Sequence, residues 1–128
     1  METVLGFDYG EARIGVAIAR KGSVEPLITL DATDPWPDIA SLMIEYTPLQ
    51  LVVGLPRNLD GHITAQTKIA QSFADSLAQL TQLPVAMQDE AMSSQRALER
   101  IGKNTPIKQR KKILDQVAAQ IILEDYLR

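Results

Sequence analysis

Short apolar segments occupy the first thirty residues of the chain, and each ends in a polar or glycine-containing turn. They cover residues 3–8, 14–19 and 24–30. Short apolar and β-branched runs are typical of strands, and gaps of only a few residues favour antiparallel hairpins. Pro26 predicts an edge strand or a bulge in the third segment, because proline has no N–H to donate to the hydrogen-bond ladder.

The spacing of apolar positions then changes to that of a helix. Ile39, Leu42, Met43 and Tyr46 share one helical face, and Asp34 is the expected N-cap. Strands and helices alternate after this point. We expect strands at 49–55 and 85–88, and helices around 69–80, at 94–101 and at 106–127. Thr105 and Pro106 are the expected N-cap and first residue of the last helix.

This order of elements predicts an α/β fold. Three antiparallel strands followed by alternating helices and strands form a five-stranded mixed sheet flanked by helices. The chain has 128 residues, the length of one ordinary domain, so we expect a single domain over residues 1–128.

The amino-acid composition excludes several kinds of functional site. The chain has no cysteine and one histidine, which excludes disulfides, thiolate zinc sites and a cysteine nucleophile. Thirteen basic against sixteen acidic residues give a net charge of −3, so no overall positive field indicates a nucleic-acid partner. No apolar run approaches the roughly 20 residues that span a bilayer, and the first residues lack a signal-peptide pattern. We therefore expect a cytoplasmic protein with no membrane partner.

Three acidic residues stand out by position. Asp8 ends the first strand, Glu90 follows the fifth, and Asp115 lies in the last helix. Each has an ordinary alternative: a turn hydrogen bond for Asp8, helix capping for Glu90, and an ion pair with Lys111 for Asp115. Together they can converge at one edge of the sheet. A cluster of carboxylates needs a cation, and all-oxygen ligation favours Mg²⁺ or Mn²⁺, which can activate water against a phosphodiester.

Basic residues that could hold a nucleic-acid backbone fall into three groups. The largest precedes Asp115 and contains Lys103, Lys108, Arg110, Lys111 and Lys112, with Arg96 and Arg100 on the preceding helix. Arg57 and Asn58 follow a buried strand, and Arg13 lies beside the Asp8 turn. Local positive surface of this kind binds phosphates. The alternatives are a solvated helix start and ordinary turn chemistry.

Four segments, in order, resemble the YqgF (RuvX) family. They are GFDYGEARIGVA at 6–17, VGLPRNLDG at 53–61, the pair Asp89 and Glu90, and DQVAAQIIL at 115–123. The resemblance implies an RNase H-like fold, a Holliday-junction-resolvase-like nuclease implicated in 5′-end maturation of 16S rRNA, and Asp8, Glu90 and Asp115 as its metal-binding residues. Ala91 stands where the family usually has arginine.

The leading hypothesis is therefore a Mg²⁺- or Mn²⁺-dependent endonuclease that acts on pre-rRNA or on branched DNA, as a monomer or a homodimer. A second hypothesis is a binding module of the same fold that holds RNA or a protein without cleavage. A third is an actin- or hexokinase-like phosphotransferase, which is disfavoured because such enzymes bind ATP between two domains and because the chain has no P-loop.

Overall fold

The computed structural model describes residues 2–56, 64–90, 93–102 and 105–128. Its elements, in chain order, are β1 (Val4–Tyr9), β2 (Arg13–Arg20), β3 (Ser23–Asp31), α1 (Trp36–Tyr46), β4 (Gln50–Leu55), α2 (Ala65–Thr81), β5 (Val85–Asp89), α3 (Ser93–Ile101) and α4 (Ile107–Leu127). The expected order of strands and helices is confirmed.

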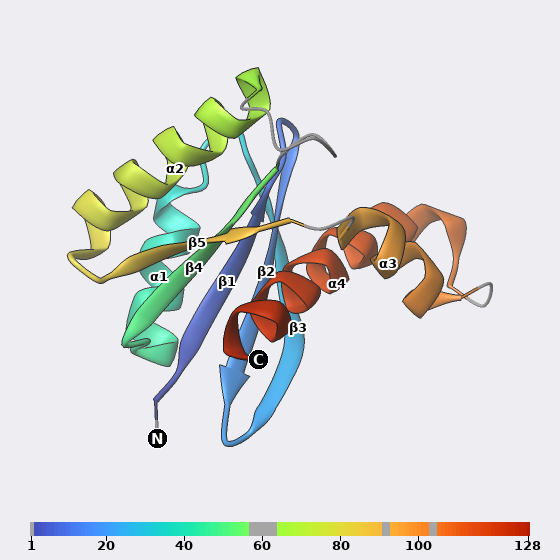
Figure 1. The fold of residues 1–128 in the computed structure, drawn as a ribbon, viewed down its shortest axis with the longest axis horizontal. Coiled ribbons are helices and arrows are strands. Elements are labelled where there is room, and N and C mark those ends of the chain that lie inside the picture. Colours follow the sequence, from blue (N-terminus) through green and yellow to red (C-terminus); the bar gives the residue numbers. More distant parts are fainter. Residues whose placement is uncertain (1, 57–63, 91–92, 103–104) are drawn as a thin grey trace.

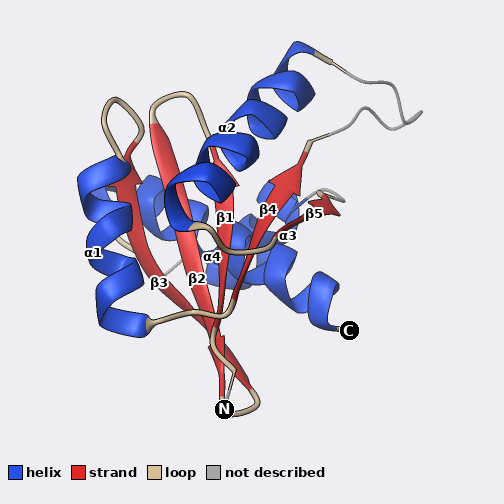
Figure 2. Ribbon diagram, turned by 90° about the vertical axis from the view of Figure 1, so that its left-hand side faces the viewer, coloured by secondary structure: helices blue, strands red, loops and turns tan. Residues whose placement is uncertain are grey.

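The strands form one mixed sheet in the order β3-β2-β1-β4-β5. β1, β2 and β3 pair antiparallel through hairpins, whereas β4 and β5 run parallel to β1. Helices α1 and α2 cover one face of the sheet, and α4 crosses the other face with α3 packed against it (Figure 1). The same three layers are visible after a quarter turn (Figure 2). Within the described residues, every helix is too short or too polar to cross a lipid bilayer.

The two faces of the central strands differ in side-chain size. On β2, Ile14, Val16 and Ile18 face the core beneath α1 and α2, where they pack with residues such as Phe73 and Leu77. The alternate positions of β2 are small and face α4. Small residues on this face let the axis of α4 approach the sheet closely, and this approach positions Asp115, which lies within α4.

Pro26 lies where the sequence predicts an irregularity. β3 is an edge strand, and its register with β2 shifts between Val16 and Ala17, the residue opposite Pro26. Both the predicted edge position and the predicted bulge are confirmed.

Two predicted helix caps are wrong. The N-cap of α1 is Pro35 rather than Asp34, and no side chain caps this helix. Pro37 is the second helical residue and has no N–H, which removes one of the donors that a capping side chain would bind. The N-cap of α4 is Pro106 rather than Thr105. The Thr105 hydroxyl instead donates to the carbonyl oxygen of Ile101 at the end of α3, at 3.4 Å.

Candidate active site

Asp8 lies at the end of β1 on the face that α4 covers. Strand alternation puts it on the side of Val4 and Gly6, away from the Leu5 and Phe7 core, as the sequence predicts. Loss of surrounding water raises the pKa of the Asp8 carboxyl well above its usual value. The charge of Glu90, a hydrogen bond shared with Glu90 and the charge of Asp115 raise this pKa further. Three carboxyl groups from distant parts of the chain therefore interact at this end of the sheet.

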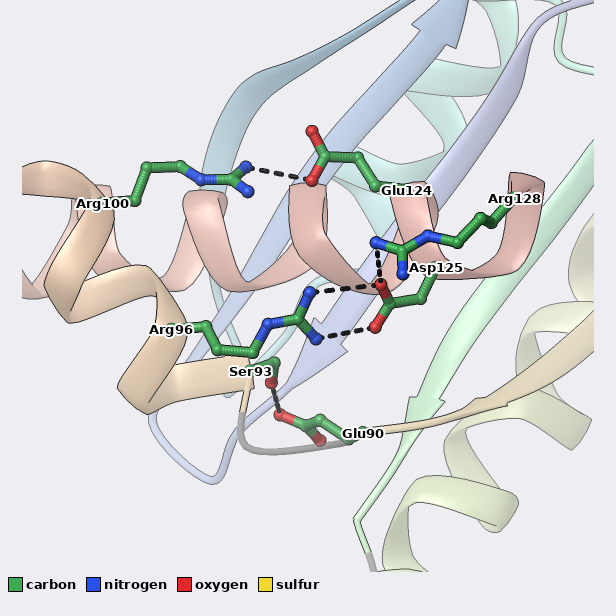
Figure 3. A network of polar contacts seen from close by, with 7 residues as sticks. All are labelled: Glu90, Ser93, Arg96, Arg100, Glu124, Asp125 and Arg128. Atoms are coloured by element: carbon green, nitrogen blue, oxygen red, sulfur yellow. Dashed lines mark hydrogen bonds and ion pairs between the residues drawn. The ribbon is translucent and has the colours of Figure 1, made fainter.

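Glu90 is held from both its main chain and its side chain. Its N–H donates to the carbonyl oxygen of Leu55 at 3.0 Å, which extends the pairing of β5 with β4 by one residue. The hydroxyl of Ser93, at the start of α3, donates to Glu90 Oε1 at 2.5 Å (Figure 3). Ser93 is only 1% exposed, so this hydrogen bond is shielded from water. Gly54 of β4 lies next to this carboxylate: a β-carbon there would be in ordinary contact with Glu90 Oε2, at 3.5 Å, but would clash with Ile122 Cδ1 of α4 at 2.5 Å.

Asp115 reaches the site because α4 packs directly on β2. Its main-chain oxygen rests on Gly15, and Gly15 is the residue opposite Asp8 in the β1–β2 register. The Asp115 side chain accepts a hydrogen bond from Arg13 Nε at 2.7 Å. Among the described residues, Asp115 forms its ion pair with Arg13 on a strand, and not with Lys111 one helical turn earlier. The informative sequence signal was Gly15, a glycine within an otherwise apolar strand.

The predicted basic residues differ in exposure and in the partners that the structure gives them. Arg13 is 37% exposed and pairs with Asp115. Arg110 donates to the carbonyl oxygen of Thr105 at 3.1 Å, while its buried Nε has no hydrogen-bond partner among the described residues. Lys111 and Lys112 are exposed at the start of α4. The predicted nucleic-acid residues Arg57, Asn58 and Lys103 lie outside the described residues, and only the helical backbone of Lys108 is described.

Arg96 and Arg100 serve a different purpose from the one expected. They join α3 to α4 through ion pairs with Asp125 and Glu124, and Arg128 also reaches Asp125 at 3.3 Å (Figure 3). Arg96 makes two hydrogen bonds to Asp125, at 2.9 and 3.3 Å. Their charge is therefore partly balanced within the protein, although both side chains stay partly exposed.

The donor set at this end of the sheet suits a hard cation. In the part of the chain that the structure describes, no three acidic or histidine side chains already form a metal-binding group. The electrostatics nevertheless favour added positive charge, because Asp8 is desolvated among like charges and the pair with Arg13 neutralises only Asp115. Carboxylate oxygens are the ligands that Mg²⁺ and Mn²⁺ prefer. The residues present thus fit such an ion.

Comparison with known proteins decides the family. Residues 2–128 match the RuvX family model, described as Holliday junction resolvase. The chain belongs to the RuvX family. A RuvX relative from Methylobacillus flagellatus is 45% identical over 96% of this chain and 88% of its own length, and one from Dechloromonas aromatica is 42% identical over 98% and 90%. Both carry the name "Putative pre-16S rRNA nuclease".

Solved structures confirm the fold that the RuvX resemblance implies. RuvC of Thermus thermophilus superimposes with a TM-score of 0.61, at 15% identity, over 100% of this chain and 96% of RuvC. That RuvC structure is a complex with a Holliday junction. A second structure of this RuvC gives a TM-score of 0.57 at 16% identity, over 98% of this chain and 95% of RuvC. The RuvX chain therefore has the RNase H-like fold of RuvC.

Proposed function

We propose that this chain is a divalent-cation-dependent endonuclease that hydrolyses phosphodiester bonds of precursor 16S rRNA, with Asp8, Glu90 and Asp115 as its acidic residues. The observation that carries the proposal is the convergence of the charges of Glu90 and Asp115 on the desolvated carboxyl of Asp8. Such an arrangement is costly to the fold and is typical of a site built for a cation.

The three carboxylates would hold Mg²⁺ or Mn²⁺, which in such sites lowers the pKa of water and stabilises a leaving oxygen. Ser93 keeps the Glu90 carboxylate in one orientation through its shielded hydrogen bond. Arg13 holds Asp115 while no cation is bound. With a cation held by the three carboxylates, Asp115 would depend less on Arg13, and the planar donors of the Arg13 guanidinium would suit a phosphate oxygen of the substrate.

The substrate assignment rests on the relatives, which are named for pre-16S rRNA. A substrate of that kind implies a cytoplasmic location. Lys111 and Lys112, exposed on the helix that carries Asp115, are suited to contact its phosphates. We assign the same role to Arg57, Asn58, Lys103, Lys108 and Arg110 as a continuing prediction. A branched-DNA substrate would require two copies of the site, since two strands must be cut symmetrically, whereas rRNA cleavage requires only a monomer.

The test compares cleavage of precursor 16S rRNA and of four-way DNA junctions by the wild type and by Asp8→Asn, Glu90→Gln and Asp115→Asn, with Mg²⁺, with Mn²⁺ and with EDTA. We expect cleavage of the rRNA only with a divalent ion, and a loss of at least about 100-fold in each variant. Asp75→Asn, an exposed carboxylate on α2, is the matched control. Cleavage that survives the three substitutions would overturn the assignment of these carboxylates. RNA binding without cleavage under any ion would reject the nuclease in favour of a binding module.

A further inference from the structure

We propose that a groove on the α1/α2 face of the sheet binds an unpaired nucleobase of the substrate strand. The groove lies at the same end of the sheet as the carboxylates but on the opposite face, and it has no role in the site described above. This inference rests on the proposed nuclease function, because it assumes that a nucleic-acid strand reaches this end of the sheet.

The groove has a volume of about 360 Å³ and lies between the end of β1, residues 32–36 and one side of α2. This volume is near the lower limit of the ~300–1,000 Å³ typical of small-molecule sites. It therefore suits a group the size of a single nucleotide better than a folded partner, which would need a broad surface.

One wall of the groove is aromatic. Tyr9 and Trp36 both contact Phe73, with ring centroids 4.7 and 5.6 Å apart and ring planes inclined by 31° and 29°. All three rings line the groove, but Phe73 is buried at 5% exposure, and the partly exposed rings are Tyr9 and Trp36. Stacking on aromatic rings of this kind is how proteins hold unpaired bases, whatever the base sequence.

The exposed side chains that α2 contributes to the groove include one positive charge, two hydroxyls and the apolar Ile69. Lys68, Ser72 and Ser76 are spaced four residues apart on α2, so they lie along one side of the helix, and all three are exposed. Lys68 lies in the first turns of α2, where the helix dipole adds positive potential. It has no ion-pair partner among the described residues, and no described residue that lines the groove is acidic. Aromatic rings with a lysine in the same groove suit the base and the phosphate of a nucleotide.

The groove and the carboxylates are joined by adjacent residues of one strand. Tyr9 directly follows Asp8, and successive side chains of a strand point to opposite faces. A single strand that passes over this end of the sheet, with one phosphate at Asp8, would bring a neighbouring base to Tyr9. Base stacking would then fix which bond lies at the carboxylates.

Trp36 is the one tryptophan in the chain and lines the groove, so its fluorescence reports on the site directly. The test titrates the wild-type protein in EDTA with a single-stranded hexanucleotide and with an abasic hexamer of the same backbone, each as RNA and as DNA. We expect the base-containing strand to quench Trp36 and the abasic strand to bind roughly tenfold more weakly without quenching. The RNA and DNA series identify the preferred sugar.

Variants of Lys68 and Ser72 test whether these two residues of the groove contribute to oligonucleotide binding. We expect Lys68→Gln and Ser72→Glu to weaken hexanucleotide binding several-fold, because one removes a positive charge and the other adds a negative one at the groove. The controls make the same charge changes elsewhere: Ser41→Glu at an exposed position of α1 that does not line the groove, and Lys21→Asn in the β2–β3 turn at the far end of the sheet. Asparagine suits the left-handed backbone of Lys21, whose φ is 53°.

Three results would overturn the groove proposal: equal binding of the abasic strand, oligonucleotide binding that leaves Trp36 fluorescence unchanged, or quenching by a short apolar peptide and by neither oligonucleotide. A Lys68→Gln variant that cleaves precursor rRNA with unchanged KM would also overturn it and leave the nuclease assignment intact. Conversely, quenching by the hexanucleotide in a protein that cleaves nothing would retain the groove and reject the nuclease.

Discussion

The main-chain oxygen of Asp115 lies so close to Gly15 that a β-carbon on Gly15 would be only 1.9 Å away from it. Real contacts to a β-carbon do not approach this distance, and the obstacle is helix backbone rather than a movable side chain. Gly15 therefore fixes how deeply α4 sits on the sheet, and with it the position of the Asp115 carboxylate beside Asp8.

Gly15→Ala should displace or destabilise α4. We expect a loss of about 1–3 kcal/mol in the free energy of unfolding, together with a large loss of cleavage, because Asp115 moves with the helix backbone. Urea unfolding and cleavage assays measure both. Gly22→Ala is the control: Gly22 has φ +76° and open space around it, so alanine there costs about 1–2 kcal/mol of backbone strain without affecting cleavage. Wild-type stability and cleavage in Gly15→Ala would contradict this account of α4.

Asp8 should make the cation-free protein less stable as the pH rises. Its pKa is raised in the folded state, so folding disfavours the ionised carboxyl. This cost is absent below the unfolded pKa of about 3.9 and is complete once the pH exceeds the raised folded value. Asp8→Asn removes the cost, and we expect the variant to have the higher thermal midpoint at neutral pH in EDTA. The difference from wild type should vanish in acid.

The difference between the thermal midpoints of wild type and Asp8→Asn reports on Asp8 alone. Other carboxylates have the opposite pH dependence and cancel in this difference; one is Asp31, whose pKa is lowered by hydrogen bonds with Thr33. Asp75→Asn should show no such pH-dependent gain. Mn²⁺ should raise the midpoint of wild type by mass action and leave that of Asp8→Asn nearly unchanged. If Asp8→Asn is no more stable than wild type at neutral pH without the ion, Asp8 does not carry the cost assigned to it.

Ser93→Ala should free the Glu90 carboxylate. The substitution removes the hydroxyl that donates to Glu90 Oε1, and we expect a 10- to 100-fold loss of kcat or of apparent Mn²⁺ affinity, as is usual for residues that orient metal ligands. Ser93→Thr keeps the hydroxyl and should retain most activity. A merely structural role would reduce stability in Ser93→Ala while leaving the Mn²⁺ concentration for half-maximal cleavage unchanged.

The ion pairs between α3 and α4 should matter for stability and little for substrate. Arg96→Ala loses a two-pronged contact with Asp125, and after screening at this partly exposed site we expect a cost of about 1 kcal/mol with unchanged KM. Lys111→Ala combined with Lys112→Ala should do the opposite. It should barely change stability, raise KM and reduce the slope of log affinity against log salt by roughly 0.7–0.9 per lysine. A raised KM in Arg96→Ala would contradict this prediction and show that Arg96 contributes to substrate binding.

Local patterns in the sequence predict most of the fold. The order of elements, the face occupied by Asp8 and the edge position of Pro26 follow from alternation, helical spacing and proline chemistry, and all are confirmed. The two wrong caps, Asp34 and Thr105, have a common cause. Each residue has the right chemistry and stands beside a proline that fixes where the helix begins, so the cap position moves by one residue.

The site depends on contacts that no local pattern contains. Arg13 and Asp115 are 102 residues apart, and their pairing depends on the depth at which α4 meets Gly15. Arg96 and Arg100 look in the sequence like part of a basic surface, because their acidic partners lie on the last turns of α4 and meet them only when α3 packs against it. Long-range packing decides which charges remain available to a substrate.

The bulge in β3 beside Pro26 has a consequence for how copies of this chain can associate. An open edge strand is a template on which another molecule can build, but β3 carries a proline and a break in register near its middle. A neighbouring strand could not extend a regular ladder along its full length. Growth of the sheet into chains or fibres through β3 is thereby discouraged. Two copies that place their proposed sites on one branched substrate would have to contact each other through another surface.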